Sequence, residues 1–350
     1  MSPDVRASLR VLRAGPGATI QDGGRFGYLR YGVTPAGPMD WIAFRTANLA
    51  LGNDDHAAAI EIPAGGFELR CEGVPLWVAF AGGAFVWRRG EAALPAAARL
   101  FLEPGETLAA RAGRFGAFAY LAVEGGFDTP LVMGSRATHL RSGIGGIEGR
   151  MLRAADVLAA APVRERDGAD FEATIDAPWL APALDPFRVV LGPQDDYFTD
   201  ASVSAFFAGT FTLTPVADRM AYRFDGPEIT AARGHDIVSD GVALGAIQIP
   251  GDRKPLVLMA DRQPTGGYPK LGHIARADIG WLAQMRPGDT CRFRKASVSE
   301  ARAALLRLED EIATTPRRLR PLRRSPTSEN LLDANLIGGV VDPLNSEGKV

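Results

Sequence analysis

The sequence predicts a mostly β protein with a few short helices, arranged as two domains. Its 350 residues exceed the roughly 100–200 residues of one typical domain. It contains 40 glycines and 25 prolines, nearly a fifth of the chain, which favours many short strands joined by turns over long helices. Short apolar or alternating runs bounded by Gly or Pro predict strands of barrels or sandwiches at residues 59–62, 67–71, 76–80 and 118–123.

Three short helices are predicted from the residues at their ends. Asp40 is expected to cap a helix over residues 41–51. Asp278 is expected to cap a second helix over residues 279–285, just before a Pro-Gly pair. A capping box at Ser297 opens a third helix, in which apolar residues recur at helical spacing.

A polar, Pro-rich stretch near the middle of the chain predicts a domain boundary. We expect an N-terminal domain over residues 1–165, a linker over 166–186, and a C-terminal domain over 187–314 that ends in a helix. An Arg-rich tail follows over residues 315–350. The arginines of this tail fit either a solvated segment or a docking strip for an acidic partner.

Charge and hydropathy exclude several classes of protein. The formal charge of −2 lacks the basic excess of a nucleic-acid binder. The most apolar stretch, residues 74–87, is shorter than the roughly 18 residues of a membrane helix, and the first residues contain no apolar signal segment. Cys71 and Cys291 stand far apart without a metal-binding motif, so we expect a cytoplasmic protein without disulfides.

The positions of the lysines and histidines exclude further kinds of site. The four lysines, 254, 270, 295 and 349, close no phosphate-binding loop of the GxxxxGK[ST] type and follow no methionine. We therefore expect no Walker-type ATP site in this chain and no covalently bound biotin at a standard Met-Lys site. The four histidines have no metal-ligand spacing, so no metal site is expected.

One candidate site lies among the glycines of the N-terminal half. Asp22, Arg25 and Asp40 could hold a carboxylate or amide ligand, because glycines let backbone N–H groups approach an anion closely. A purely structural role fits these residues as well. Asp22 and Arg25 would then pair beside a hairpin turn, and Asp40 would only cap its helix.

A second candidate site surrounds a Gly-Gly turn in the C-terminal half. The turn offers backbone donors to an oxyanion or phosphate, and a carboxylate, an amide, two hydroxyls and an ammonium lie on either side of it. Alternatively, the turn is a β-bulge whose Tyr and Pro fill a barrel mouth. The residues of this candidate site are Gln248, Asp261, Thr265, Gly266, Gly267, Tyr268 and Lys270.

A series of motifs follows in order over about residues 9–300. The motifs include Gln21-Asp22-Gly23-Gly24-Arg25, Gly37-Pro38-Met39-Asp40, Asp218-Arg219-Met220, Gly245-Ala246-Ile247-Gln248 and the run from Asp261 to Pro269. In these motifs the chain resembles the biotin-dependent carboxyltransferase family, also called allophanate hydrolase subunit 2. That family includes the C subunit of the bacterial 5-oxoprolinase complex, the antagonist of a sporulation-kinase inhibitor, and the carboxyltransferase domain of urea carboxylase.

The resemblance implies two tandem cyclophilin-like β-barrel domains. It further implies a C subunit that works with a B-type subunit, and with an A subunit, in ATP-dependent hydrolysis of a small cyclic amide, with any ATP site unusual or shared with the partner. Two alternatives remain open. One is carboxyl transfer to a urea-like amide from biotin supplied in trans, and the other is a non-catalytic antagonist of a kinase-inhibitor protein.

For the leading hypothesis, an enzyme subunit that binds a small carboxylate or lactam, we assign hypothetical roles to the candidate residues. Proton or charge transfer is expected at Asp261, Lys270 and Tyr268. Binding of a small amide or carboxylate substrate is expected at Asp22, Arg25, Asp40, Gln248, Thr265, Gly266 and Gly267.

Overall fold

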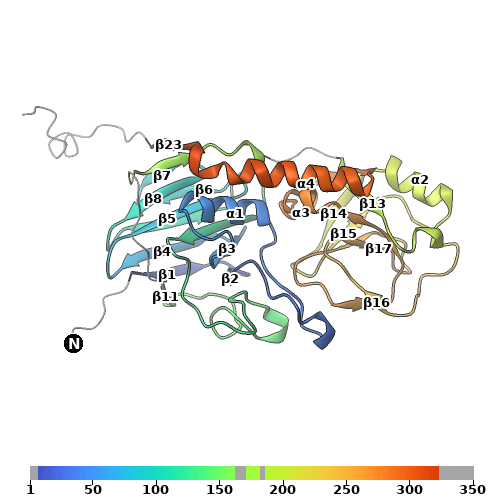
Figure 1. Ribbon diagram of the computed structural model, residues 1–350, viewed down its shortest axis with the longest axis horizontal. Coiled ribbons are helices and arrows are strands. Elements are labelled where there is room, and N and C mark those ends of the chain that lie inside the picture. Colours follow the sequence, from blue (N-terminus) through green and yellow to red (C-terminus); the bar gives the residue numbers. More distant parts are fainter. Residues whose placement is uncertain (1–6, 162–170, 182–185, 323–350) are drawn as a thin grey trace, which may run out of the picture.

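The computed structural model describes residues 7–161, 171–181 and 186–322, which form a mostly β protein (Figure 1). The N-terminal half contains two antiparallel sheets. The first has the strand order β11-β1-β4-β9-β6-β7 and the second the order β2-β3-β10-β5-β8-β12-β23. The strands of the first sheet are β1 (Ser8–Ala14), β4 (Phe67–Glu72), β6 (Val86–Arg89), β7 (Ala92–Leu94), β9 (Thr107–Arg111) and β11 (Val157–Ala159). Those of the second are β2 (Thr19–Gln21), β3 (Ala59–Pro63), β5 (Leu76–Ala81), β8 (Ala98–Leu102), β10 (Phe118–Val123), β12 (Ala173–Ile175) and β23 (Leu319–Pro321).

The C-terminal half is built on one sheet of eight strands that almost closes into a barrel. Its order is β21-β14-β15-β18-β17-β20-β13-β22, and the two edge strands are separated in sequence only by Arg292. Because the edges are neighbours in the chain, they must meet in space. The strands are β13 (Phe187–Leu191), β14 (Phe211–Ala217), β15 (Ala221–Asp225), β17 (Ala246–Gln248), β18 (Leu256–Leu258), β20 (Lys270–Ile274), β21 (Thr290–Cys291) and β22 (Phe293–Lys295), and a separate ribbon pairs β16 (Asp240–Gly241) with β19 (Thr265–Gly266).

Helices cover the sheets and join the two halves. The α-helices of the described residues are α1 (Trp41–Ala50), α2 (Asp200–Ala208), α3 (Arg276–Ala283) and α4 (Val298–Ala313). The 3-10 turns are η1 (Leu29–Tyr31), η2 (Leu140–Ser142), η3 (Pro178–Leu180), η4 (Asp195–Tyr197) and η5 (Thr315–Arg318). No helix in this part of the chain combines the length and apolar character that a bilayer crossing requires.

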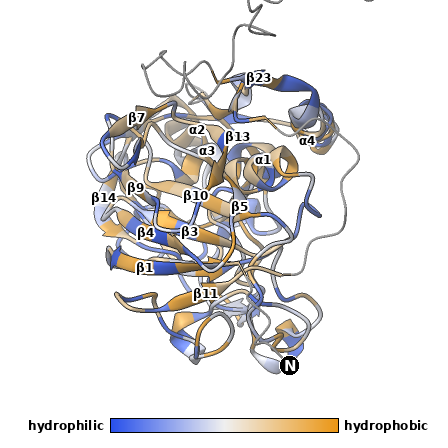
Figure 2. Ribbon diagram, turned by 90° about the vertical axis from the view of Figure 1, so that its left-hand side faces the viewer, coloured by the Kyte–Doolittle hydropathy of each residue, from blue (hydrophilic) through white to orange (hydrophobic). Residues whose placement is uncertain are grey.

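The core of the N-terminal half follows from the period of its strands. β4 alternates buried and half-buried residues, so one face points to the core between the two sheets. Its hydrophobic and hydrophilic residues alternate in the same way (Figure 2). β5 is buried along its whole length. It needs two apolar faces because one packs against the first sheet and the other against α1, where Ala79 and Ala81 join the same cluster as Phe44.

The predicted strands at residues 59–62, 67–71, 76–80 and 118–123 are confirmed as β3, β4, β5 and β10. The prediction for the first helix is also confirmed, since Asp40 Oδ1 accepts hydrogen bonds from the N–H groups of Ile42 and Ala43 at 3.0 and 3.1 Å.

The predicted cap of the second helix is wrong. α3 begins at Arg276 rather than after Asp278, whose carboxylate instead accepts a hydrogen bond from the backbone N–H of Arg188 at 2.6 Å. This tertiary contact to β13 outcompetes local capping, and the helix starts one turn earlier. At the last helix, Ser297 Oγ accepts a hydrogen bond from Glu300 N at 3.1 Å, as the capping box predicts.

The C-terminal segments return to the N-terminal half, which the sequence did not indicate. Within the expected linker, β12 joins the second sheet, and within the expected tail, β23 pairs with β12. α4 runs along both halves (Figure 1), and Leu308 and Ile312 pack with Trp41 and Trp179. Residues 162–170, 182–185 and 323–350, including the remainder of the Arg-rich tail, lie outside the described residues.

The phenylalanine cluster of the barrel generates a stability prediction. Phe293 on β22 is buried, with its ring centroid 4.9 Å from that of Phe206 and 5.3 Å from that of Phe211. Phe293→Ala is expected to lower the free energy of unfolding by about 3–5 kcal/mol in urea titrations, because it empties the core where the barrel closes. Val238→Ala, at a side chain 92% exposed, is the control and should change stability by less than about 0.5 kcal/mol. Equal effects of the two variants would contradict this account.

Candidate functional site

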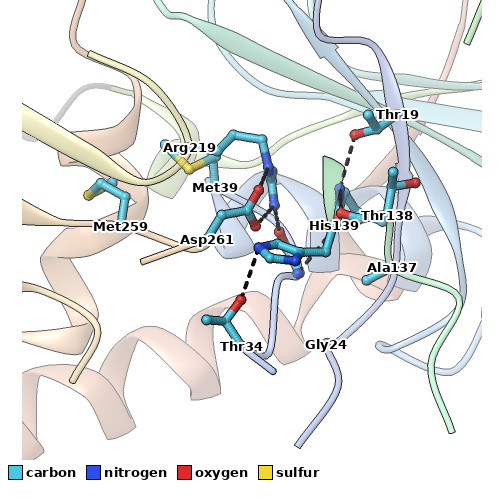
Figure 3. Close-up of polar contacts among 12 residues, drawn as sticks. Thr19, Gly24, Thr34, Met39, Ala137, Thr138, His139, Arg219, Met259 and Asp261 are labelled. Atoms are coloured by element: carbon cyan, nitrogen blue, oxygen red, sulfur yellow. Dashed lines mark hydrogen bonds and ion pairs between the residues drawn. The ribbon is translucent and has the colours of Figure 1, made fainter. Parts of the chain in front are cut away.

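An arginine at the boundary between the two halves holds two carboxylates, of which Figure 3 labels that of Asp261. Arg219, in the turn between β14 and β15, donates from Nε and Nη2 to the two oxygens of Asp261 at 2.9 and 2.8 Å. Its Nη1 pairs with Glu61 on β3, and its Nη2 also reaches the carbonyl oxygen of Gly37 at 2.7 Å. One guanidinium therefore links the C-terminal barrel to the second sheet of the N-terminal half.

The contacts continue from Glu61 into the N-terminal half. Glu61 Oε2 accepts hydrogen bonds from Tyr120 Oη at 2.7 Å and from Met39 N at 2.9 Å. Tyr120 Oη in turn accepts from the backbone N–H of Asp40 at 2.8 Å. We call Asp40, Glu61, Tyr120, Arg219 and Asp261 the interdomain network.

Burial sets the protonation of this network. Asp40 is almost fully buried, and burial, with a further contribution from the charge of Glu61, raises the pKa of Asp40 to about 6. Gln284 Nε2 donates to Asp40 Oδ2 at 2.6 Å, which offsets only part of that effect. Burial also raises the pKa of Tyr120 well above its ordinary value, so this phenol stays protonated and donates to Glu61.

His139 lies beside the interdomain network (Figure 3). The sequence did not single it out as a site residue, because it belongs to no recognisable motif. Its ring nitrogens lie 3.2 Å from Thr34 Oγ1 and 2.8 Å from Ser142 Oγ. Burial lowers the pKa of His139, although the charge of Asp261 partly opposes this, so the imidazole is neutral at pH 7. A neutral imidazole that is hydrogen-bonded to hydroxyl groups can accept or donate a proton. Among the described residues, no group of three or more His, Cys, Asp or Glu side chains could hold a metal ion.

A second polar group lies in the C-terminal barrel. Lys270 Nζ, only 2% exposed as a side chain, pairs with Asp240 Oδ2 at 2.8 Å. The side chain of Gln194 contacts both members of this pair. Its Oε1 accepts a hydrogen bond from Lys270 N at 3.2 Å, and its Nε2 donates to Asp240 Oδ2 at 3.4 Å. A buried ammonium held by one exposed carboxylate keeps hydrogen-bond donors for a further acceptor.

Gln248 adds an unsatisfied amide to this group. It pairs with Lys270 in the β17–β20 ladder and is completely buried, yet neither its Oε1 nor its Nε2 has a hydrogen-bond partner. Gly266 lies directly beside it, since a Cβ at this position would lie 2.5 Å from Gln248 Nε2. A buried amide without partners costs stability unless something else pairs with it, so its position fits a ligand. We call Gln194, Asp240, Gln248 and Lys270 the barrel site.

The structure places the predicted site residues of the C-terminal half in two separate groups. Gln248, Gly266 and Lys270 lie together, with Thr265 and Gly267 on the same turn and Tyr268 39% exposed two residues before Lys270. Asp261 belongs to the interdomain network instead, and within the described part of the chain no hydrogen bond or ion pair joins it to the barrel site. The expected catalytic role of Asp261, Tyr268 and Lys270 stays a prediction.

The predicted residues of the N-terminal half organise a loop. Asp22 accepts hydrogen bonds from Gly24 N at 2.9 Å and Ser135 Oγ at 2.7 Å, and it lines a surface hollow of about 440 Å³. Arg25 is buried and donates to the carbonyl oxygens of Val132 at 2.8 Å and Ala137 at 2.9 Å. The expected ion pair between Asp22 and Arg25 does not form, because the Arg25 guanidinium donates to backbone carbonyl oxygens instead. Substrate binding by Asp22, Arg25 and Asp40 stays a prediction.

The comparisons with known proteins identify the family. A family model described as "carboxyltransferase domain, subdomain A and B" matches residues 31–295. The chain is 36% identical over 293 residues to the C subunit of 5-oxoprolinase from Escherichia coli, covering 84% of this chain and 93% of that protein. It is likewise 36% identical over 298 residues to the C subunit of 5-oxoprolinase from Haemophilus influenzae, with the same coverage of 84% and 93%.

A solved structure agrees with these matches. The crystal structure of Kluyveromyces lactis urea carboxylase superposes with a TM-score of 0.81 at 28% identity, over 93% of this chain and 31% of that one. The chain therefore belongs to the carboxyltransferase-domain family, as its motifs predict. The predicted mostly β, barrel-based fold class is confirmed, and the relatives are components of enzymes.

Arg219 is expected to be essential to the interdomain network. Arg219→Met leaves the largely enclosed carboxylates of Glu61 and Asp261 without a cationic partner, so urea denaturation should show a loss of about 3–5 kcal/mol. Arg233→Met is the matched control, because Arg233 pairs with Asp196 on the surface with 60% of its side chain exposed, and should cost at most about 1 kcal/mol. An Arg219→Met protein as stable as the control would refute the structural role.

Asp40 generates a prediction about pH. Its folded pKa of about 6 exceeds its unfolded value of 3.8, so the folded state holds this proton more tightly. The contribution of Asp40 to stability is therefore greatest below pH 4 and falls by up to about 3 kcal/mol as pH rises through 6. Asp40→Asn keeps the helix cap but cannot ionise. Parallel denaturation curves at pH 4 to 7 should show this slope in the wild type only, and the same slope in the variant would contradict the assignment.

Proposed function

We propose that the chain is the C-type component of an ATP-dependent complex that hydrolyses a small cyclic amide of the 5-oxoproline class. The observation that carries this proposal is the 36% identity to the C subunit of 5-oxoprolinase, which extends over 93% of that protein. In this proposal a B-type subunit acts together with the chain, and ring opening is completed by an A subunit. The complex would act on a substrate that carries both an amide and a carboxylate.

The barrel site supports the proposal because its groups match an amide. Both polar atoms of the Gln248 side chain are free, so its Nε2 can donate to the carbonyl oxygen of a lactam and its Oε1 can accept from the lactam N–H. Lys270 places an ammonium beside it and stabilises negative charge that develops on the lactam oxygen. The backbone of Thr265, Gly266 and Gly267 supplies the adjoining turn, and Tyr268 reaches the solvent-exposed rim.

In the same proposal the interdomain network positions the barrel rather than reacting. Both oxygens of Asp261 are engaged by Arg219, so Asp261 fixes the C-terminal barrel against Glu61 on the first half. Asp22 and Arg25 fix the loop that carries His139, because their contacts lie at residues 132–137.

ATP is assigned to a site that the B-type subunit holds or completes. The described residues of this chain do not fit the triphosphate of ATP and its magnesium ion well. The amino end of α1 is capped by the carboxylate of Asp40, so it repels a phosphate. The described residues also contain no group of three or more His, Cys, Asp or Glu side chains that could hold a metal ion. Of the lysines, Lys270 and Lys254 are already paired, with Asp240 and Asp225. ATP, when bound, would activate the amide carbonyl, while the groups of this chain bind and orient the lactam.

The proposal is tested by reconstitution. ATP-dependent release of glutamate from 5-oxoproline should require this chain together with its B-type and A subunits, each omitted in turn. Lys270→Met is expected to lower kcat/KM by about 100-fold or more, and Gln248→Leu by about 10- to 100-fold, because each removes a hydrogen bond that strengthens in the transition state. Val238→Ala should be fully active.

Three results would contradict the proposal. Full activity of both barrel-site variants would remove the barrel site from the reaction. A complex that assembles but releases no glutamate would exclude 5-oxoproline, and tight partner binding without any activity would favour the antagonist role.

Carboxyl transfer is the second candidate function. It is favoured by the family description and by the superposition on urea carboxylase, of which this chain matches 31%. The barrel site would then bind a urea-like amide, and biotin would arrive on a separate carrier protein. Urea-dependent consumption of carboxybiotin on an added carrier, abolished by Lys270→Met, would support this function over lactam hydrolysis.

A further inference from the structure

A cleft lies where the two halves meet beside the C-terminal helix. It has a volume of about 350 Å³ and is lined by the first residues of α1 and α3, by the loop that carries Asp55 and His56, and by Glu309 of α4. It lies outside both the barrel site and the interdomain network. The volume suits a small organic molecule rather than a macromolecule.

Two arginines of the cleft lie over the same indole. The Cζ atoms of Arg276 and Arg45 are 5.1 and 5.7 Å from the Trp41 ring centroid, within the range of cation–π contacts. Trp41 is buried, and its Nε1 donates to the carbonyl oxygen of Arg276 at 3.2 Å. The indole therefore holds both guanidinium groups in place without consuming their hydrogen-bond donors.

The two arginines differ in how their charge is balanced. Arg45 is neutralised, since its Nη2 lies 2.6 Å from Asp55 Oδ2 and its Nη1 lies 3.9 Å from Glu309 Oε1. The guanidinium of Arg276 makes no hydrogen bond or ion pair with any residue that the structure describes, and it lies over the Trp41 ring instead. One positive charge in the cleft is therefore left without a partner.

The surroundings of Arg276 also favour a negatively charged ligand. Arg276 is solvent-exposed at the cleft, where the neighbouring protein removes part of its hydration. This desolvation, followed by the positive charge of Arg262, lowers the pKa of Arg276 to about 10, and Glu309 only partly offsets the effect. The amino end of α3, which has no side-chain cap, lies at the same wall and also favours a negative charge.

We propose that this cleft binds a small carboxylate that also carries an N–H donor, with the carboxylate on Arg276 and the N–H on Glu309. A single unpaired guanidinium matches one negative charge, whereas a phosphate dianion would be repelled by the nearby carboxylates of Asp55 and Glu309. Glu309 makes only one long ion pair, so it can accept a hydrogen bond from an amine or amide N–H.

The ligand chemistry overlaps with the proposed function, because 5-oxoproline and glutamate both belong to this class. The cleft is nevertheless a separate site from the barrel. A ligand there would contact residues of α1, α3 and α4 at once and so tie the two halves together.

The test measures binding by calorimetry in a background that carries both Lys270→Met and Gln248→Leu, which removes the two barrel-site groups assigned to the lactam. The probes are 5-oxoproline, L-glutamate and the neutral lactam 2-pyrrolidinone, with inorganic phosphate as the other anion. Saturable binding of 5-oxoproline or glutamate is expected, at least tenfold tighter than that of phosphate or 2-pyrrolidinone. Arg276→Gln should weaken it at least tenfold, and Glu309→Gln should weaken it less.

Arg307→Gln, on the exposed surface of the same helix as Glu309, is the matched control and should bind as tightly as the parent. Equal affinity of Arg276→Gln, preferential binding of phosphate, or no binding of either carboxylate would each overturn the inference. If the carboxylates fail to bind while the reconstituted wild-type complex is active, only the cleft is refuted. If they bind while the complex is inactive, only the proposed function is refuted.

Discussion

The arrangement of this protein depends on the charge of one largely enclosed arginine. Arg219 faces Asp261 from its own half and Glu61 from the other, and neither carboxylate has another cationic partner among the described residues. Burying two carboxylates is tolerable only because this guanidinium pairs with both. The orientation of the barrel against the second sheet therefore follows from electrostatics as well as from the shared hydrophobic cluster, in which Tyr120 and Leu271 take part.

Polar groups of this molecule serve two different purposes. In the interdomain network almost every donor and acceptor is satisfied, which is the pattern of a structural element. In the barrel site and the cleft, by contrast, Gln248 and Arg276 keep unused hydrogen-bonding capacity. For the buried amide of Gln248 this unused capacity costs stability, which a ligand that supplies the missing partners would recover, whereas Arg276 is exposed and open to a ligand from solvent.

Local sequence was a good guide where local physics decides. Alternating or apolar runs bounded by turn residues located β3, β4, β5 and β10, and the caps at Asp40 and Ser297 located two helix starts. The same reasoning was wrong at Asp278, where a partner distant in sequence, Arg188, took the carboxylate. A cap is a weak preference of about 1 kcal/mol, so a charged tertiary contact overrides it.

The sequence by itself determined the mostly β class, the family and the presence of Gln248, Lys270 and Asp261 in conspicuous motifs. Only the tertiary structure decided that Asp261 lies apart from the other two, and that Arg276 stacks on Trp41. The physical reason is separation along the chain. Trp41 and Arg276 are 235 residues apart, and no periodicity or spacing encodes a contact that forms only when α1 and α3 pack together.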